Sequence, residues 1–569
     1  MCGFVCVINK SLNGVKEIPD DLLKHRGPDY SEQKNYGNIC IRHWRLSIVD
    51  LTEDGNQPIE DSQYMFAYNG ELYNYNKIGK EVFNRSYNSD TKVFFDLLKS
   101  GMINKIKSMT GFYSYILFDK NKNEITGGRD FWGKKPLFYY LNDEVAIFSS
   151  EEKAILKLIN KKWNLDKETI QTYLEYKNTF NGRSYFEGVL EIPPGGDFYF
   201  NIQDWKLLIE PTWSDYYLTP LLTKISPDSL DEKSRSASDE GFIPLIKKAV
   251  DVRFSCDVPI QIALSGGVDS CAILTYANSI TVLKDKILGA LTVKFSDQKD
   301  ESQKAALIAN TLGINHKYIN FYTNELLSNL RKAIRFYGGP LDHPHSIAYF
   351  LLCEEASKNG KVLITGEGAD ELFYGYSHYQ NTANESFAFR KFLNLDAYFL
   401  TNNLSDFSYK NSYIKYRSLA LKSHSTSRDM EIKTHLISLL KRNDRMSMAH
   451  SVEIRAPFID LPLLFHSITT DFIDKHKNKS FLKEWINQLM PTYIPDKEKI
   501  GFYVPFDDWF EKYSSTEDVQ NIICRALTYI DLNLNLKFIK KDFLKIDSRL
   551  GWILCNLGIF LEEYDHYVK

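Results

Sequence analysis

The segment VPIQIALSGGVDSCAILTYAN, residues 258–278, decides the fold class of the second half of the chain. VPIQIAL has the apolar content of a buried strand, and CAILTYAN begins a helix. Between them, the adjacent Gly266 and Gly267 let the backbone approach a phosphate closely, and the helix start offers unpaired N–H groups. The order of strand, glycine loop and helix therefore predicts a phosphate-binding loop in an α/β domain.

The sequence on both sides of this loop continues the same alternation. LGALTVKF (288–295) and KVLIT (361–365) are further short apolar strands, separated by helical stretches. Upstream, the apolar residues between Phe242 and Val250 fall on one face of a helix. Beyond about residue 380 the pattern is mostly helical. We expect a parallel sheet with a helical C-terminal part.

The first 200 or so residues have a different pattern. Aromatic and β-branched runs such as YMFAYNGELYNY and GFYSYILFDKNKNEI are broken by turn signals, which favours a largely antiparallel arrangement of strands. The polar interval SPDSLDEKSRSASDE (226–240) is the best candidate for a domain boundary. Together with the family resemblance of the motifs in each part, this pattern predicts two α/β domains, residues 1–205 and 206–569.

Composition excludes several classes of protein. The 569 residues carry a net charge of -3 with 43% hydrophobic residues, which makes no general electrostatic case for nucleic-acid or membrane binding. No run reaches the ~18 apolar residues of a membrane span, and the first residues do not form a secretory signal, so we expect a cytosolic protein. Eight scattered cysteines without a CxxC pair indicate neither a disulfide framework nor a zinc knuckle.

One cysteine is placed unusually. If the initiator Met is removed, Cys2 carries both a thiol and a free α-amino group, and that amine can act as the base for its own side-chain nucleophile. Cys2 would then be a self-contained acyl-transfer centre.

The motifs that follow Cys2 resemble a known family. In order along the chain they are MCGF, HRGPDY (25–30), HWRLSIVD (43–50), YNGELYNY (68–75), SD (89–90), GRDFWGKKPLFYY (128–140) and FSSEEKAI (148–155). Together they resemble the N-terminal-nucleophile (Ntn) glutaminase domain of the asparagine synthetase type of amidotransferase. The resemblance implies an Ntn-hydrolase αββα sandwich for the first domain and a glutaminase activity.

The same resemblance implies roles for residues of this sequence. Cys2 would attack the glutamine side-chain carbonyl, and Asn69 with the backbone N–H of Gly70 would form the oxyanion hole. Arg45 would hold the α-carboxylate of glutamine, and Glu71 and Asp90 would accept from its α-ammonium. Leu46 and Val49 would complete the glutamine-binding site.

SGGVDS (265–270) resembles the pyrophosphate loop of ATP pyrophosphatases, which cleave ATP between the α and β phosphates and make an acyl-adenylate. VLITGEGADELFYGY (362–376) resembles the acidic loop that faces it in asparagine synthetases. The resemblance implies Mg²⁺ binding by Asp269 and Asp370, an ion that uses one or two carboxylates plus substrate phosphates. It also implies ATP binding by Leu264, Ser265, Gly266, Gly267, Asp269, Ser270, Val293, Thr365 and Gly366.

Three further assignments rest on the same resemblance. Glu367 matches a residue needed for adenylate formation and for handling ammonia. DKEKIGFYVPFDDWF (496–510) resembles the lysine-containing loop, which makes Lys499 the expected cation over the pyrophosphate; Lys497 stands where an arginine is common. KRNDRMSMAHSVEIRAPFID (441–460) matches a stretch that packs the synthetase core, so we assign it to structure.

The expected function is a glutamine-dependent, ATP-dependent amidotransferase. Ammonia released at Cys2 would pass through an internal tunnel to an acyl-adenylate, and the expected acceptor is aspartate. The segment FYGGPLDHPHSIAYF (336–350) differs from the family's typical sequence on the acceptor side. Its run from His343 to Ser346 leaves open a different carboxylate as the acceptor, such as a sugar uronic acid in surface polysaccharide synthesis or a natural-product intermediate. Two other hypotheses stay open. The chain could be an inactive homologue that acts as a binding protein, or a synthetase that uses only free ammonia. The expected partners are small molecules, with a homodimer left open.

Overall fold

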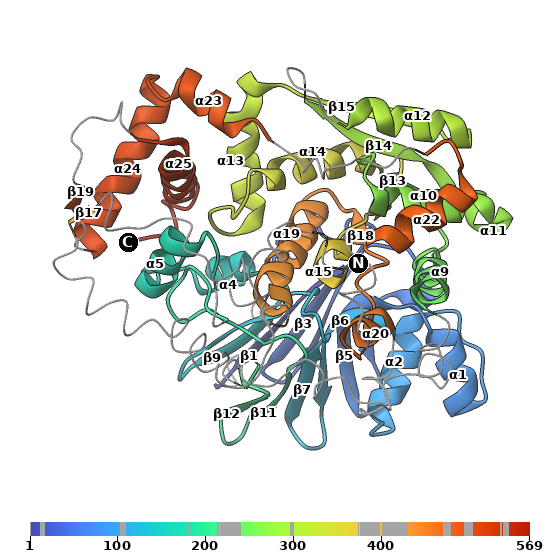
Figure 1. Ribbon diagram of the computed structural model, residues 1–569. Coiled ribbons are helices and arrows are strands. Elements are labelled where there is room, and N and C mark those ends of the chain that lie inside the picture. The colour runs from blue at the N-terminus through green and yellow to red at the C-terminus, as the bar shows by residue number, and fades with distance from the viewer. Residues whose placement is uncertain are drawn as a thin grey trace.

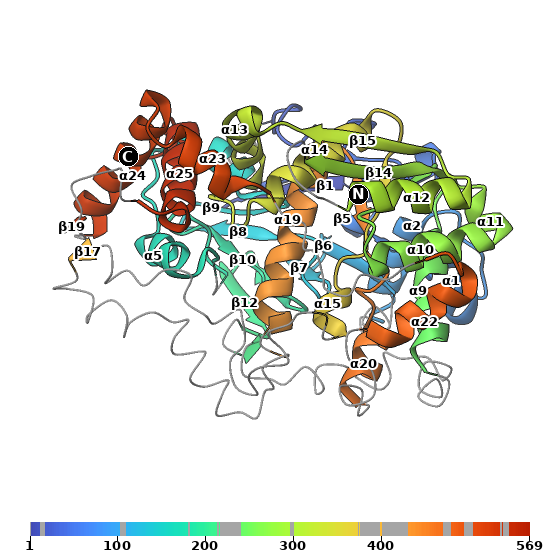
Figure 2. The ribbon, with the colours of Figure 1, turned by 45° about the horizontal axis from the view of Figure 1, so that its top comes forward.

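The computed structural model of the protein describes residues 2–11, 17–102, 110–179, 182–212, 215–216, 241–295, 301–373, 375, 399–400, 429, 431–469, 479–493, 504–534, 537–538 and 546–569. Two antiparallel sheets form one half of the molecule, and a parallel sheet with its helices forms the other (Figure 1). Helix α19 (Ile437–Met448) lies between the two halves in both views (Figures 1 and 2).

The first domain contains two six-stranded sheets. One has the order β10-β8-β9-β1-β3-β2, with strands Leu190–Glu191, Phe138–Leu141, Val145–Ser149, Cys2–Asn9, Ile39–Arg45 and Tyr30–Tyr36. The other has the order β12-β11-β7-β6-β5-β4, with strands Lys206–Glu210, Asp197–Asn201, Glu124–Arg129, Gly111–Asp119, Tyr64–Leu72 and Ile59–Glu60. All of these pairings are antiparallel, as the sequence predicted.

The period-two pattern of the strands places these sheets face to face. Along β1, Phe4, Cys6 and Ile8 point into the core between the sheets, and Val5 and Val7 point away from it. Phe148 and Phe198 stack across that core with ring centroids 4.5 Å apart. Helices α1 (Tyr75–Phe83) and α2 (Asp90–Lys99) cover the outer face of one sheet, and α4 (Glu152–Ile159) and α5 (Lys167–Tyr176) that of the other. The predicted αββα sandwich is therefore confirmed.

The predicted parallel sheet is also confirmed. Its order is β15-β14-β13-β16-β18, with strands His316–Phe321, Ile287–Phe295, Ile260–Ala263, Val362–Ile364 and Glu453–Arg455. From β13 the chain builds outward to β14 and β15, and then returns to the other side of β13 with β16. Ligands of open α/β sheets bind at such a reversal, in the crevice outside the carboxyl ends of the strands.

Helices connect and cover the strands of this sheet. Those before and among the strands are α9 (Phe242–Arg253), α10 (Val268–Ser279), α11 (Thr281–Lys284), α12 (Ser302–Leu312), α13 (Leu326–Tyr337), α14 (His345–Ser357) and α15 (Ala369–Leu372). A 3-10 turn at Thr323–Glu325 precedes α13, and another lies in the first domain at Glu53–Gly55. A π-helical turn, η7 (Ile432–Leu436), leads directly into α19.

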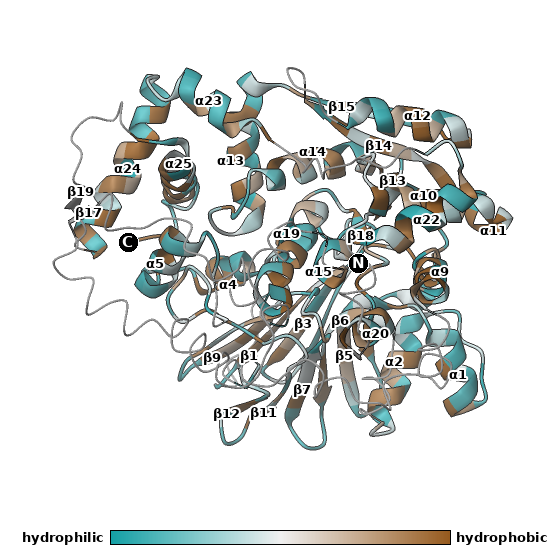
Figure 3. Ribbon diagram, viewed as in Figure 1, coloured by the Kyte–Doolittle hydropathy of each residue, from teal (hydrophilic) through white to brown (hydrophobic). Residues whose placement is uncertain are grey.

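The C-terminal part is mostly helical, as expected. Its helices are α20 (Leu461–Thr469), α22 (Ser480–Leu489), α23 (Phe506–Tyr513), α24 (Glu517–Leu534) and α25 (Ser548–Glu563). All residues from Leu550 to Leu561 in α25 are buried, and Figure 3 shows its hydrophobic character beside the more hydrophilic α23. The exceptions are β18 and the two-stranded pair β17 (Phe399–Leu400) and β19 (Lys537–Phe538), which are too short to show alternation in the sequence.

The two domains share hydrophobic cores. Leu46, Ile48 and Trp132 from the first domain belong to the same buried cluster as Phe254 and Phe458 from the second. Strand β12 extends the first domain's sheet to Glu210, five residues beyond the predicted boundary at 205/206, whose position stays a prediction. Residues 217–240, which contain the polar interval, lie outside the described residues.

Two expectations from the composition concern membrane-spanning segments and the cysteines. In the part of the chain that the structure describes, no helix is both long and apolar enough to cross a bilayer. All eight cysteines are free thiols, and all except Cys524 are buried, where a cysteine packs as a small hydrophobic residue. The cytosolic location stays a prediction.

The stacked pair between the sheets provides a test of the sandwich. We expect Phe198→Ala to lower the free energy of unfolding of the first domain by about 3–5 kcal/mol, because it leaves a cavity against Phe148. Urea denaturation followed by tryptophan fluorescence measures this loss. Leu208→Ala on β12, where Leu208 is 49% exposed, is the matched control and should cost less than about 1 kcal/mol. Equal effects of the two substitutions would contradict this packing.

Candidate active sites

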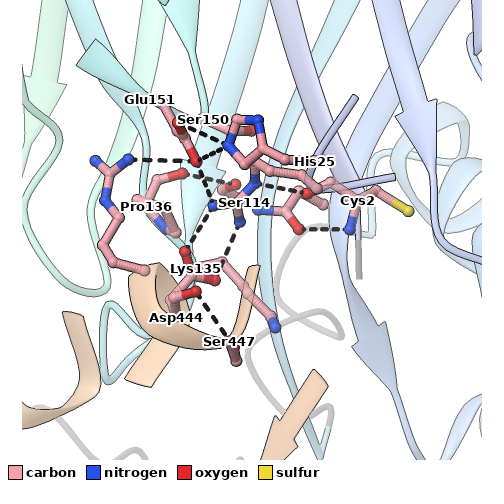
Figure 4. Close-up of polar contacts among 12 residues, drawn as sticks. Cys2, His25, Ser114, Lys135, Pro136, Ser150, Glu151, Asp444 and Ser447 are labelled. Carbon is pink, nitrogen blue, oxygen red and sulfur yellow. Dashed lines mark hydrogen bonds and ion pairs between the residues drawn. The ribbon is translucent and has the colours of Figure 1, made fainter. Parts of the chain in front are cut away.

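Cys2 is the first residue of β1, and the strand register places it opposite Arg45 on β3. Its main-chain nitrogen, which would be the α-amino group after removal of Met1, donates to Asn69 Oδ1 at 3.1 Å (Figure 4). Asn69 belongs to β5 in the other sheet, so this contact joins the two sheets at one end of the sandwich. The structure thus brings together the predicted nucleophile and the predicted oxyanion residue.

The side-chain NH2 group of Asn69 donates to no described residue. Asn69 is 0% exposed, and among the described residues no hydrogen-bond acceptor lies within reach of its Nδ2 atom. A buried polar atom without a partner is rare in folded proteins and costs free energy. The following residue, Gly70, has no room for a side chain, because a Cβ there would collide with the Phe112 carbonyl oxygen on β6 (Gly111–Asp119).

The surroundings of the Cys2 thiol have opposing effects on its charge. Burial raises the pKa of this thiol, whereas the main-chain N–H of Leu46 and the positive charge of Arg45 act to lower it, and the nearby Asp90 acts to raise it. Leu46, Arg45 and Asp90 therefore all lie close enough to Cys2 to influence it. Val49, the other predicted glutamine-binding residue of this loop, packs against the core shared with the second domain.

Arg45 is buried and held by neutral groups. Its guanidinium donates to the carbonyl oxygens of Thr52, at 2.6 Å, and of Asp50, and to Asn56 Oδ1 at 2.8 Å. No carboxylate in the part of the chain that the structure describes forms an ion pair with it. These contacts orient the guanidinium without neutralising its charge, which suits the binding of a carboxylate ligand.

Asp90 and Glu71 lie in different surroundings. Asp90 begins α2 and accepts hydrogen bonds from Tyr68 Oη, from Leu72 N at 3.1 Å and from Thr91 N at 2.8 Å. Glu71 forms an ion pair with Arg455, a residue of β18 in the second domain. Burial acts to raise the pKa of Glu71, and the positive charge of Arg455 opposes that rise. The cross-domain partner of Glu71 was not expected from the sequence.

The predicted phosphate loop has the expected geometry. It joins β13 to the N-terminus of α10, with Gly267 as the N-cap and Gly266 at a φ of +87°, a conformation that favours glycine. The hydroxyls of Ser265 and Ser270 lie 3.2 Å apart, and Ser265 Oγ accepts from Gly267 N at 3.2 Å. A helix N-terminus with adjacent hydroxyls is an anion-binding arrangement.

The second predicted loop lies against the first. A Cβ on Gly366 would lie 2.9 Å from Asp269 Cβ, so the loop after β16 approaches the start of α10 very closely. Thr365 is 2% exposed, and its Oγ1 atom lacks a hydrogen-bond partner among the described residues. Leu264 follows β13, and its carbonyl oxygen accepts from Thr292 Oγ1 of β14 at 2.5 Å; Val293 is the next residue of β14, and both Leu264 and Val293 are buried.

Glu367 is held by two residues from neighbouring helices. Its Oε2 atom accepts from Tyr349 Oη of α14 at 2.8 Å and from Arg442 Nη2 of α19 at 2.7 Å. The guanidinium of Arg442 also lies 4.3 Å from the centroid of the Tyr349 ring. The carboxylate of Glu367 is therefore fixed beside the phosphate loop.

Lys479 joins the two predicted metal ligands, a role that sequence reasoning missed. Its Nζ atom lies 2.8 and 2.6 Å from the carboxylate oxygens of Asp269 and 2.5 Å from Asp370 Oδ1. Lys479 is 4% exposed and has a left-handed φ of +55° at the start of α22. A single lysine before a helix carries no motif, so no sequence signal marks this role. The other predicted cation, Lys499, and its neighbour Lys497 lie outside the described residues.

The segment from His343 to Ser346, singled out for the acceptor side, leads into α14. Nδ1 of His343 lies 3.2 Å from Nζ of Lys177, which follows α5 in the first domain. Its ring also lies 5.8 Å from that of His435 and 5.9 Å from that of His345, measured between centroids. Helix α14, which begins at His345, also carries Tyr349, the residue that donates to Glu367.

Two families of known proteins match successive parts of the chain. Residues 1–211 match the glutamine amidotransferase domain family, and residues 242–543 match the asparagine synthase family. Asparagine synthetase 1 (glutamine-hydrolyzing) of Bacillus subtilis (strain 168) is 26% identical over 593 aligned positions, covering 93% of this chain and 90% of that protein. Asparagine synthetase 3 of the same strain is 26% identical, covering 88% of this chain and 86% of that protein.

A fungal protein is also similar to part of the chain. Amidase chry2 of Gibberella zeae (strain ATCC MYA-4620) is 28% identical over 386 aligned positions, covering 63% of this chain and 55% of that protein. The asparagine synthase match alone spans more than half of the 569 residues, and the glutamine amidotransferase match accounts for the domain before it. The chain therefore belongs to the asparagine synthase family of glutamine-hydrolysing ligases.

Proposed function

We propose that this protein transfers the amide nitrogen of glutamine to a carboxylate that it activates with ATP, and that the acceptor is aspartate. The observation that carries the proposal is the amide of Asn69, whose Oδ1 holds the Cys2 nitrogen and whose buried Nδ2 lacks an acceptor among the described residues. A donor kept free beside a nucleophile is what an oxyanion hole requires.

In the glutaminase half, the Cys2 thiolate attacks the side-chain carbonyl carbon of glutamine. The resulting oxyanion accepts hydrogen bonds from Asn69 Nδ2 and from the N–H of Gly70. The α-amino group of Cys2 takes the thiol proton and delivers it to the leaving nitrogen, so the C–N bond breaks and ammonia departs from a thioester. Water then hydrolyses the thioester to glutamate. Arg45 would bind the substrate α-carboxylate, and Asp90 and Glu71 would face its ammonium.

In the synthetase half, an oxygen of the acceptor carboxylate attacks the α-phosphorus of ATP and pyrophosphate leaves. Ser265, Ser270 and the N-terminus of α10 would bind the phosphates, and Thr365 Oγ1 would gain a partner from the nucleotide. Ammonia then attacks the acyl carbon, Glu367 accepts the surplus proton, and AMP departs. Lys499 is proposed as a further cation at the pyrophosphate.

Asp269 and Asp370 would hold Mg²⁺. Their carboxylates converge on one point, which the ammonium of Lys479 occupies as a stand-in cation, so the donor set fits a divalent cation. When bound, Mg²⁺ supplies positive charge to the phosphate oxygens of the nucleotide. When no Mg²⁺ is bound, the ammonium of Lys479 neutralises the carboxylates of Asp269 and Asp370.

A second acceptor class is favoured by one observation. The cluster of Lys177, His343 and His435 offers an ammonium and imidazoles that suit an anionic or hydroxylated acceptor larger than aspartate. The likeness to an amidase over part of the chain also leaves the acceptor open. A homodimer and action in the cytosol stay predictions.

Removing the nucleophile separates the two halves of the reaction. We expect Cys2→Ala to lower glutamine-driven amide synthesis by about 10³-fold or more, and to leave ammonia-driven synthesis within about twofold. Pyrophosphate release under the two nitrogen sources measures both. Cys524→Ala, at the exposed cysteine, is the control. Equal loss of both activities in Cys2→Ala would contradict the two-site assignment, and a wild-type protein without either activity would identify an inactive homologue.

Lys479 provides a test of the cation site. We expect Lys479→Met to tighten Mg²⁺ binding to the nucleotide-free protein by about tenfold or more, because the competing ammonium is removed from between two carboxylates. Isothermal titration with Mg²⁺ measures this affinity. Lys483→Met, one turn further along α22, should leave it unchanged. An unchanged affinity in Lys479→Met would place the metal elsewhere.

A panel of acceptors tests the substrate. The wild-type protein is assayed for pyrophosphate with ATP, Mg²⁺ and ammonia, and with aspartate, a hexuronic acid or a simple monocarboxylate as the acceptor. Stimulation by aspartate alone is the expected result. Strong stimulation by the uronic acid and none by aspartate would instead support the second acceptor class.

A further inference from the structure

Arg26 connects the nucleophile strand to the second domain. It is 0% exposed, and its Nε atom donates to the carbonyl oxygen of Cys2 at 3.0 Å. Its Nη1 and Nη2 atoms donate to the two carboxylate oxygens of Asp444, at 2.9 and 3.1 Å, and Nη1 also contacts Glu151 at 2.9 Å. Figure 4 draws Cys2, Glu151 and Asp444 in this one polar cluster.

Asp444 is the partner that fixes the orientation of Arg26. Glu151 is shared, because His25 Nε2 and Arg445 Nη1 also contact it, at 3.1 and 3.5 Å. By contrast, Asp444 accepts from both terminal nitrogens of Arg26, and a two-point contact fixes the plane of a guanidinium. The third nitrogen then points at Cys2. Arg26 in turn leaves little freedom to the chain beside Cys2, since a Cβ on Gly3 would lie 3.1 Å from Arg26 Cδ.

Asp444 belongs to α19, and the same helix also contacts Glu367 of the predicted synthetase site. Two residues earlier on the same helix, Arg442 binds Glu367 at 2.7 Å. Residues 442–448 of α19 are all buried, so the helix is packed on every side over this stretch. One rigid element of the synthetase domain therefore contacts both the Cys2 strand, through Arg26, and the Glu367 carboxylate.

We propose that Asp444 is a positioning residue for glutamine hydrolysis, supplied by the synthetase domain. By holding Arg26, it sets the main chain of Cys2 at the distance from Asn69 that the attack on glutamine requires. The inference rests on the proposed function of Cys2 and adds that the glutaminase centre is complete only with α19 docked against it. The packing role assigned to residues 441–460 from the sequence is then only part of what this stretch does.

The test uses the full chain with Asp444→Asn, which keeps the shape and removes the charge. We expect kcat for glutamine hydrolysis to fall at least about tenfold while the KM for glutamine changes less than about threefold, because Arg45 and Asp90 are untouched. Alkylation of Cys2 by iodoacetamide, followed by peptide mass spectrometry, should also change in rate. Ammonia-driven synthesis should stay within about twofold, which shows that the variant folds.

Two further variants keep the result specific. Asp444→Glu, which retains the carboxylate, should recover part of the lost kcat. Asp460→Asn removes the carboxylate of another buried ion pair, with Arg253 at 2.5 Å, and should leave glutamine hydrolysis within about twofold. If Asp444→Asn hydrolyses glutamine as the wild type does, or loses both activities equally, the positioning role is overturned. A wild-type protein that does not hydrolyse glutamine would instead overturn the proposed function.

Discussion

Buried ion pairs across the domain boundary are the constraint on which both sites depend. Arg455 lies between Glu71 of the first domain and Glu453 of its own strand, and Arg26 reaches Asp444 in the opposite direction. Removing one partner of such a pair leaves an uncompensated buried charge, at a cost of about 3–5 kcal/mol. These pairs therefore fix how the two domains pack, and they place Arg455 and Asp444 of the second domain beside Glu71 and Arg26 of the first.

The same boundary explains why α19 is rich in buried polar residues. A helix inside a core normally carries apolar side chains all round, but α19 buries Arg442, Asn443, Asp444 and Arg445 together. Each charged member has a partner of opposite charge: Glu367 for Arg442, Arg26 for Asp444, and Glu152 for Arg445. Because buried charges persist only when paired, the sequence of this helix is understandable only beside both domains.

The residues predicted from the sequence came from two kinds of signal. Gly266 and Gly267 are required by backbone geometry between a strand and a helix, and this local requirement is readable without the fold. Cys2, Asn69 and Asp90 came from ordered motifs that resemble a family, and the structure places Asn69 in contact with Cys2. Lys479 could not be found in either way, because its role arises from a position between Asp269 and Asp370, which lie far from it in the chain.

The sequence by itself determined the classes of both domains, since alternation of period two and the order of strand, loop and helix are local properties of the chain. It also marked Cys2 and the glycine loop at residues 265–270 as candidate site elements. Only the tertiary structure decided which charges meet: Glu71 with Arg455, Arg26 with Asp444, and Lys479 with both aspartates. The physical reason is that an ion pair requires proximity in space, and the packing of two domains sets that proximity between residues hundreds of positions apart.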